Sequence, residues 1–223
     1  MKKLIILFLL AAAGSTVYAQ TQTYSPVYPR PMAKKYFGFT YNMAWPVGTT
    51  RDFIDKTSFS GFSLEGRSAS GGSGLMLGGY FGWNLFYQVK SDPITIEQEG
   101  FGGTVSGTQE RYVNSMPILF TAAYDLGGDM TDMVQPFVSM GIGMTYYVQT
   151  WGLGVALYEQ RTWHFTLMPE VGTYVYLDDR GKTSLYLAGR YLLAFDSGED
   201  VVGRDDNQLT YFMLGVGLQF SPF

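Results

Sequence analysis

The stretch YFGFTYNMAW, from Tyr36 to Trp45, alternates large apolar side chains with mostly smaller or more polar ones. The large apolar set shares one parity: Phe37, Phe39, Tyr41, Met43 and Trp45. Successive side chains of a β-strand point to opposite faces, so this period of two predicts a strand with one strongly apolar face. The alternation alone leaves open whether that face meets a protein core or lipid.

The first twenty residues, MKKLIILFLLAAAGSTVYAQ, have the layout of a secretory signal peptide. Two lysines precede a short apolar run, and Val17-Tyr18-Ala19 forms a small-residue exit. We therefore expect residues 1–19 to be cleaved, residues 20–35 to form a periplasmic lead, and residues 36–223 to form one domain. The run is too short to span a bilayer.

The composition excludes several classes of protein. The chain has no cysteine, so an exported form has no disulfide framework. Without residues 1–19 it carries 13 basic and 19 acidic residues and no basic cluster, which argues against nucleic acid as a partner. Charged residues make up 15% of the chain and aromatic residues 17%, whereas ordinary domains contain about 25% charged residues. This balance favours a membrane β-barrel.

Eight segments with alternating patterns follow one another along the chain. Most reach the roughly 9–11 residues that a tilted strand needs to cross a bilayer. They are residues 36–46, 58–69, 74–89, 111–125, 134–149, 162–177, 183–195 and 208–220. Pro117 and Pro169 fall inside two of them, where we expect a bulge or a displaced strand end, because proline removes a ladder hydrogen bond.

The connections alternate in length. SASGGSG, LGGDMTDM and DDRGK are short, whereas VGTTRDFIDKT, KSDPITIEQEGFGGTVSGTQE, TWGLGVALYEQR and DSGEDVVGRDDN are long. Short turns on one side and long loops on the other are typical of outer-membrane barrels, with the long loops outside the cell. The sequence thus predicts an all-β fold, an eight-stranded antiparallel up-and-down transmembrane β-barrel.

The side chains on the other face of each segment indicate whether its apolar face contacts lipid or a protein core. A soluble barrel would expose to water a face rich in Lys, Glu and Asp, but here the second parity contains mainly Gly, Ser, Thr, Ala, Asn and Tyr. Its sparse charges, Glu65, Arg67, Glu170 and Arg190, fall in the middle of their segments and sum to zero. Facing lipid, each arginine would cost about 2–4 kcal/mol at the bilayer midplane. We therefore predict a polar lumen filled by these side chains, with the aromatic face turned to lipid.

The chain resembles the small eight-stranded outer-membrane β-barrels of Gram-negative bacteria, the OmpA- and OmpX-like barrels. The resemblance covers residues 36–223 and rests on the signal peptide, the eight segments, the loop lengths and the last segment, LTYFMLGVGLQFSPF. It implies that a terminal aromatic residue, Phe220 or Phe223, is read by the barrel assembly machinery. The family includes tethers, adhesion factors, small or gated pores and lipid A-modifying enzymes, so membership implies fold and place rather than activity.

Few residues point to chemistry, and each has a structural alternative. His164 would suit the base of a lipid A-modifying enzyme, but no serine lies near it in sequence and its parity makes it a lumen-lining residue. The four lumen charges would gate a narrow channel if their pairs exchange, or form a static plug. An eight-stranded barrel is just wide enough for side chains to fill, which favours the plug.

The loops carry no recognisable cofactor or metal motif. Asp196, Glu199, Asp200, Asp205 and Asp206 cluster in one loop, but the spacing of a calcium loop is absent. The loop of residues 90–110 either extends two strands above the membrane, offering a sheet edge to a partner, or remains a plain loop. We therefore expect a non-enzymatic outer-membrane protein without cofactor or metal, which contacts lipid and acts on an extracellular or envelope partner through its long loops.

Overall fold

The structure is a computed structural model of the chain. It describes residues 35–69, 74–91, 94–98, 101–105, 107–127, 133–154, 156–178, 182–195 and 208–221. The expected signal peptide and nearly all of the expected periplasmic lead, residues 20–35, lie outside the described residues. The first strand begins at Lys35, one residue before the domain boundary expected from the sequence.

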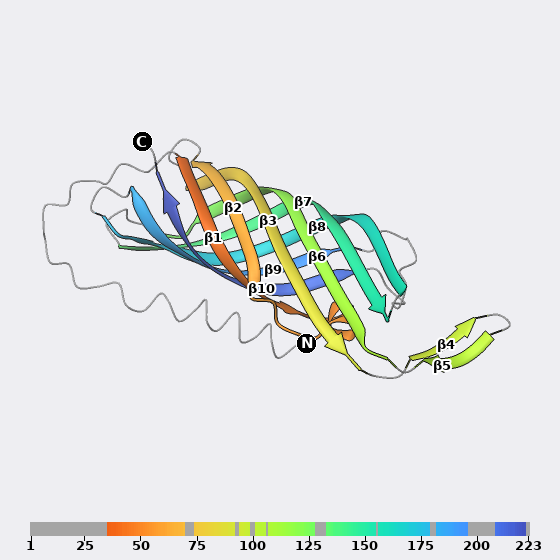
Figure 1. Cartoon of the computed structure of the whole chain (residues 1–223). Helices are drawn as coiled ribbons and strands as arrows, with labels where there is room; N and C mark the ends of the chain where they lie inside the picture. Colours follow the sequence, from red (N-terminus) through yellow and green to blue (C-terminus); the bar gives the residue numbers. More distant parts are fainter. Residues whose placement is uncertain are drawn as a thin grey trace, which may run out of the picture.

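Eight antiparallel strands form a closed barrel in the order β1-β10-β9-β8-β7-β6-β3-β2 (Figure 1). Their bounds are β1 Lys35–Pro46, β2 Ser60–Ala69, β3 Leu75–Lys90, β6 Gln109–Asp125, β7 Val134–Leu153, β8 Ala156–Tyr176, β9 Thr183–Ala194 and β10 Leu209–Phe220. The first and last strands close the barrel, with a register that runs from Phe37↔Phe220 to Pro46↔Tyr211. The predicted fold class is confirmed, and each of the eight predicted segments corresponds to one strand.

Two further elements lie between the strands of the barrel. Helix α2, Thr49–Phe53, follows β1, and β4 (Ile94–Gln98) pairs with β5 (Phe101–Val105) in a separate two-stranded sheet. Figure 1 shows this hairpin standing away from the barrel. Of the two outcomes left open for the loop of residues 90–110, the structure therefore shows the two extra strands. No helix in the described part of the chain is long and apolar enough to cross a membrane.

We call the end of the barrel with these two elements the loop end, and the opposite end, where β1 begins and β10 finishes, the turn end. Along β1 the parity predicted from the sequence is confirmed. Phe37 and Phe39 are more than half exposed on the outside of the barrel. Thr40 and Asn42, of the other parity, are completely buried inside.

The connection between β7 and β8 differs from the sequence-based expectation. The stretch TWGLGVALYEQR, residues 150–161, was expected to be a long loop, but most of it is strand. The β7–β8 ladder continues to the pair Leu153↔Ala156, with Gly154 in the left-handed region at φ 60°. Positive φ costs glycine little, so it permits a tight turn here. The two strands therefore form a long hairpin at the loop end.

The two strand prolines leave the register unchanged, so the expected bulges are absent there. Pro117 stays opposite Thr145 on β7, while the β6–β3 ladder passes from Phe81↔Ile118 to Asn84↔Ser115. Pro169 likewise stays opposite Met140 on β7, and the β8–β9 ladder resumes at Glu170↔Arg190. Each proline interrupts pairing with only one neighbouring strand, because its missing N–H faces that strand.

Candidate functional site: a closed lumen beneath a loop plug

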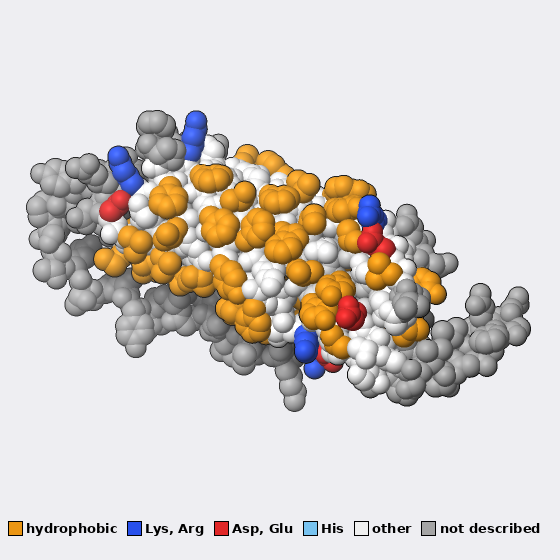
Figure 2. All heavy atoms as spheres, in the orientation of Figure 1, with side chains coloured by type: hydrophobic (Ala, Val, Ile, Leu, Met, Phe, Trp, Pro, Cys, Tyr) orange, Lys and Arg blue, Asp and Glu red, His pale blue; other side chains and the backbone are white. Residues whose placement is uncertain are grey.

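The outer wall of the barrel is an apolar belt. Exposed large side chains occur on the outward parity of every barrel strand, for example Phe39 on β1, Ile142 on β7 and Val216 on β10. On the eight barrel strands, as far as the structure describes their side chains, the outward-facing charges lie toward the strand ends, and they are Lys35, Glu110, Glu159 and Arg161. Figure 2 shows this distribution on one face, with charged side chains toward the ends of the strands. A soluble monomer rarely exposes a continuous apolar surface of this extent.

The middle of the lumen contains the four charges singled out from the sequence, which we call the charged layer: Glu65, Arg67, Glu170 and Arg190. All four are 3% exposed or less. Arg67 Nη2 contacts Glu170 Oε2 at 2.5 Å and Glu65 Oε2 at 3.2 Å. Arg190 Nε contacts Glu170 Oε1 at 3.1 Å, and its Nη2 pairs with Glu65 Oε1. Each arginine thus bonds to both carboxylates, and the buried charges compensate one another.

The strand register explains how these residues meet. Glu65 and Arg67 are two positions apart on β2 and therefore share the inner face. Glu170 and Arg190 are opposite partners on β8 and β9. Gly215 on β10 lies between the two pairs, where a Cβ atom would be 2.8 Å from Thr40 Cγ2 and 3.1 Å from Arg190 Nη1. The absence of a side chain at Gly215 lets Arg190 reach across the inside of β10.

Aromatic side chains fill the turn end of the lumen. This tyrosine layer consists of Tyr36, Phe137, Tyr174, Tyr176 and Tyr186. The rings of Phe137 and Tyr174 stack at 4.7 Å, and Arg67 lies over the Phe137 ring at 4.9 Å. Arg67 Nη1 also donates to the Tyr174 hydroxyl at 3.0 Å. The tyrosine layer and the charged layer are therefore continuous.

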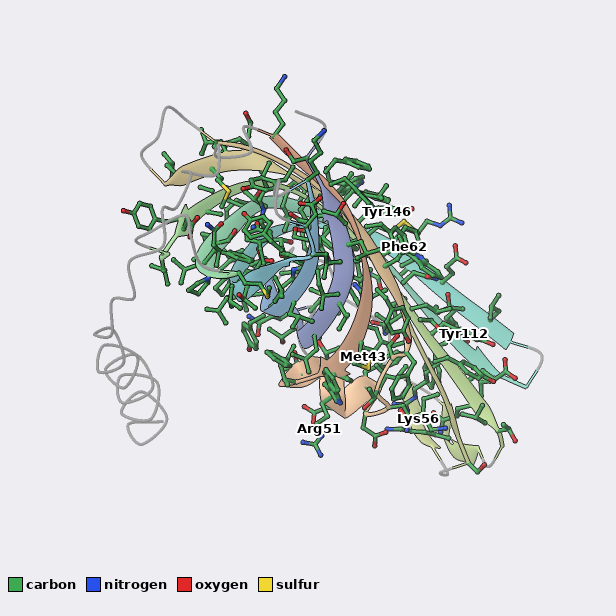
Figure 3. All side chains as sticks on the ribbon, turned by 90° about the vertical axis from the view of Figure 1, so that its left-hand side faces the viewer. Met43, Arg51, Lys56, Phe62, Tyr112 and Tyr146 are labelled. Atoms are coloured by element: carbon green, nitrogen blue, oxygen red, sulfur yellow. The ribbon has the colours of Figure 1, made fainter. Side chains whose placement is uncertain are left out.

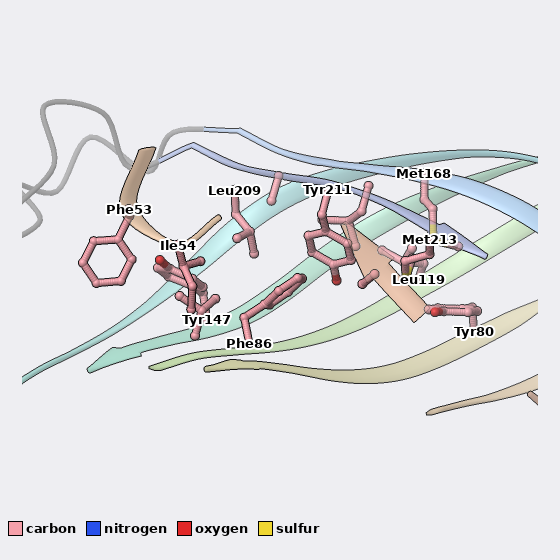
Figure 4. Close-up of a cluster of buried hydrophobic side chains, with 14 residues drawn as sticks. Phe53, Ile54, Tyr80, Phe86, Leu119, Tyr147, Met168, Leu209, Tyr211 and Met213 are labelled. Carbon is pink, nitrogen blue, oxygen red and sulfur yellow. The ribbon is translucent and has the colours of Figure 1, made fainter. Parts of the chain in front are cut away.

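The loop-end half of the lumen contains a cluster of buried apolar side chains beside buried polar ones such as Asn84, Thr145 and His164, so the lumen that was predicted to be polar is partly apolar. We call this buried cluster the apolar column (Figure 4). It consists of Ala44, Tyr80, Phe86, Val113, Leu119, Tyr147, Met168, Leu192, Ala194, Leu209, Tyr211 and Met213, together with Phe53 and Ile54. Tyr80 forms its inner end, because Arg190 of the charged layer lies over the Tyr80 ring at 5.0 Å.

Phe53 and Ile54, at the end of helix α2, close the mouth of the apolar column, and we call them the plug. Both are buried, at 2% and 0% exposed. Arg111 on β6 donates to the Phe53 carbonyl oxygen at 2.7 Å, and its guanidinium lies 4.9 Å from the centre of the Phe53 ring. Figure 3 shows Arg51, on the same helix, pointing away from the barrel. The helix thus places apolar side chains inward and a charge outward.

Burial is the main contribution to the stability of the plug. A fully buried phenylalanine or isoleucine side chain contributes about 1.5–3 kcal/mol relative to an exposed one. Helix α2 has only five residues, begins after Gly48 and lacks a side-chain cap. Isolated helices of this length are unstable in water. The plug therefore depends on its contacts with the barrel.

His164 lies at the loop end and does not join the charged layer. It is completely buried. Its Nε2 is 2.7 Å from Thr162 Oγ1, and its Nδ1 is 2.8 Å from the Phe195 carbonyl oxygen. The first contact lies within β8, and the second links β8 to the start of the connection after β9. They hold the imidazole as part of the lumen wall.

The remaining sequence-predicted positions lie elsewhere. Phe220 is 47% exposed on the outer wall at the turn end, whereas Phe223 lies outside the described residues. The acidic loop with Asp196, Glu199, Asp200, Asp205 and Asp206 also lies outside them. Within the described ranges, no group of three or more His, Cys, Asp or Glu residues is arranged to hold a metal ion.

Sequence reasoning missed the apolar column and the plug. A signal for the column was present, since Phe86, Leu192 and Met213 have the inward parity of their strands. No comparable signal marked Phe53 and Ile54, because a loop has no periodicity to assign a face.

No protein-family model matches the sequence, and no curated protein matches it. Among solved structures, Neisserial surface protein A aligns with a TM-score of 0.57 and 12% identity, over 84% of this chain and 97% of that one. The chain shares the fold of the small eight-stranded outer-membrane β-barrels. At this identity, the likeness concerns the fold alone.

Two further solved structures align less well. The outer membrane protease OmpT from Escherichia coli has a TM-score of 0.46 and 9% identity, over 72% of this chain and 63% of that one. Ail, the attachment invasion locus protein of Yersinia pestis, solved with the heparin analogue sucrose octasulfate, has a TM-score of 0.43 and 12% identity, over 83% and 96%.

Proposed function

We propose that the protein is an integral outer-membrane β-barrel with a closed lumen that acts, without catalysis, through the surface at its loop end. The observation that carries this proposal is the combination of an apolar outer wall with a lumen filled from one end to the other. Exposed Phe39 and Val216 suit lipid contact, whereas the buried charged layer fills the middle of the barrel. A polar residue set confined to the inside is the pattern of a membrane barrel.

The loop end offers surface for a partner. The described pairing of β8 with β9 begins at Thr166↔Ala194, so residues 156–164 of β8 extend beyond the end of β9. Tyr158, on this extension, is 50% exposed. The β4–β5 hairpin adds a second projection. We infer an extracellular or envelope protein as the partner, since extended strands and exposed aromatic rings support protein contacts.

Position-specific photo-crosslinking in cells tests the interaction. A photo-crosslinking amino acid at Tyr158 is expected to give one discrete protein adduct, whereas the same amino acid at Ile142, on the outer wall, gives none. Replacement of residues 94–105 by a short Gly-Ser linker tests whether the hairpin belongs to the same surface. Absence of an adduct at Tyr158 and across the hairpin would contradict an interaction role.

Two measurements separate this proposal from its alternatives. In planar bilayers the protein is expected to show no sustained unitary openings; regular openings would favour a narrow channel instead. The lipid A mass spectrum of producing cells is expected to be the same with the wild-type protein and with His164→Ala. A spectrum that depends on His164 would favour a lipid A-modifying enzyme.

A further inference from the structure

Strand β8 has an open edge at the loop end of the barrel. Its pairing with β9 reaches Thr166↔Ala194, and the Phe195 N–H then donates to the Phe165 carbonyl oxygen at 2.8 Å. On its other side, β8 stays paired with β7 as far as Leu153↔Ala156. Among the residues that the structure describes, residues 157–163 of β8 are therefore paired on one side only.

The bond at Phe165 shows which backbone groups face this edge. In an antiparallel sheet, every second residue of a strand directs its N–H and C=O groups to the same neighbouring strand. Because Phe165 bonds on the β9 side, the odd-numbered residues before it face that side too, and they are Leu157, Glu159, Arg161 and Trp163. Pro169 agrees with this assignment, since it interrupts only the pairing with β9. These residues offer their backbone groups to an incoming strand.

The side chains along this edge lie on the outer face and define a charge pattern. Leu157 and Trp163, at the two ends, are 69% and 52% exposed. Between them, Arg161 pairs with Glu159 at 2.6 Å on the exposed surface. Charges on an edge strand reduce unspecific pairing, because like charges directly opposite each other are destabilising. They favour a strand that places an acidic residue opposite Arg161 and a basic residue opposite Glu159.

A second copy of the chain in the same membrane does not fit this edge. Two copies with the same orientation are related by an axis along the membrane normal, and the strands of a membrane barrel are tilted by about 35–45°. Their β8 edges would therefore cross, whereas strand pairing requires them to run side by side. The edge suits an extended segment of another protein.

We propose that the β8 edge binds an extended segment of a partner protein as an additional antiparallel strand. Along this segment an apolar, an acidic, a basic and a second apolar residue alternate with residues of any type. The first apolar residue lies opposite Trp163 and the last opposite Leu157, while the acidic and basic residues lie opposite Arg161 and Glu159. The proposal rests on the proposed function, because it specifies how the partner contacts the loop end.

Disulfide exchange at equilibrium, in a glutathione buffer, tests the strand addition. The chain contains no cysteine, so Gln160→Cys gives the protein, held in lipid bilayers, a single thiol. The probe is the peptide Val-Thr-Glu-Cys-Lys-Thr-Val, whose cysteine lies opposite position 160 in the proposed register. Even-numbered residues of β8 form non-hydrogen-bonded pairs with the added strand, where Cα atoms are about 4.5 Å apart and a disulfide fits. We expect a mixed disulfide between protein and peptide.

N-methylated peptides distinguish backbone pairing from contact through side chains. A methyl group on the backbone nitrogen of the peptide lysine, which faces β8, should lower the equilibrium constant about tenfold, because it removes a hydrogen bond and blocks close approach. The same methyl group on the following threonine nitrogen faces away from β8 and should leave the constant unchanged. With Phe59→Cys, on the exposed connection between β1 and β2, both peptides should react equally. Equal constants at position 160 would overturn the proposal.

The charge pattern has its own comparison. A peptide with its glutamate and lysine exchanged should have an equilibrium constant about fivefold lower, since two exposed cross-strand pairs then carry like charges. Adding Glu159→Arg and Arg161→Glu to the protein should reverse this preference. An unchanged preference would overturn the assigned charges. If the peptide fails to pair at position 160 while Tyr158 still gives an adduct in cells, strand addition is wrong and the proposed function stands.

Discussion

The lumen is closed twice, by the charged layer in its middle and by the plug at its loop end, and the two closures are built differently. Glu65, Arg67, Glu170 and Arg190 extend from strands whose backbones are fixed by the barrel ladder. Phe53 and Ile54 come from a connection held by the burial of these two side chains and by a few hydrogen bonds to the strands. The charged layer is therefore part of the barrel wall, whereas the plug packs against the wall from a connecting segment.

Because of this difference, the charged layer is fixed as long as the barrel is folded, whereas the plug can open locally. When a buried ion-pair cluster loses one member, an uncompensated charge stays buried. The substitution therefore destabilises the whole fold. A loop segment that covers an apolar surface can leave while the strand ladders persist, which makes local opening less costly than unfolding. We therefore expect variants of the charged layer to unfold the barrel and variants of the plug to open it.

The largest effect is expected from Arg190→Met. It leaves two buried carboxylates with a single arginine, and breaking a buried ion pair in this way costs about 3–5 kcal/mol. The free energy of unfolding in urea, measured in lipid vesicles by the mobility of unboiled protein, checks it. Arg161→Met is the matched control, since Arg161 pairs with Glu159 at 2.6 Å on the exposed surface and should contribute less than about 1 kcal/mol. Equal losses would remove the distinction between the charged layer and surface pairs.

Phe53→Ala tests the other closure. We expect the docked plug to lose about 1.5–3 kcal/mol of stability, because the variant no longer buries the phenylalanine ring. The accessibility of Met213→Cys to a water-soluble maleimide should rise in this background while the unboiled protein keeps its compact mobility. Phe59→Ala, from the same connection but outside the barrel, should leave that accessibility unchanged. Loss of the compact band on Phe53→Ala would mean that the plug belongs to the folding core.

Gly215→Ala adds a methyl group where the charged layer crosses β10. The new Cβ would lie 2.8 Å from Thr40 Cγ2, so the neighbours must shift, at a cost of about 1–3 kcal/mol. Gly189→Ala on β9 is the control, because its Cβ would be 3.5 Å from the nearest atom, Phe212 Cζ, and should change stability by less than about 0.5 kcal/mol. Urea unfolding of both variants checks the comparison, and similar values would contradict close packing at Gly215.

The smallest effect is expected from Ser115→Ala, next to Tyr211 of the apolar column. Ser115 Oγ lies 2.8 Å from the Tyr211 hydroxyl, and its loss should cost about 0.5–1.5 kcal/mol. Tyr211→Phe added to Ser115→Ala should cause little further loss, because the bond that the Tyr211 hydroxyl still accepts from Asn84 Nδ2 is long, at 3.4 Å. Unfolding titrations of the single and double variants measure this. A further large loss would show that the Tyr211 hydroxyl has another essential partner.

Much of the fold was predictable from local pattern. The period of two in Phe37, Phe39 and Tyr41 gave the strand and the outward face, because a strand's side chains alternate whatever it pairs with. The effect of the two strand prolines was predicted wrongly. A bulge at Pro117 was a local expectation, but the β6–β7 ladder holds the register on the other side.

The site was predictable only in part, for a related reason. The inward parity of Glu65 and Arg190 follows from sequence, but their contact joins residues 125 positions apart and depends on the space left by Gly215. The length of the β7–β8 hairpin was underestimated, because Gly152 and Gly154 interrupt the alternation that marks a strand.

By itself the sequence determined the number of barrel strands, their order along the chain and the face of each that meets the surroundings, since these follow from side-chain alternation and turn spacing. Only the tertiary structure decided how the lumen is filled. Closure of β1 against β10 brings distant charges together, and the mouth receives Phe53 and Ile54 from a connection without periodicity. Alternation specifies a face, but filling depends on the volume left by all the other side chains.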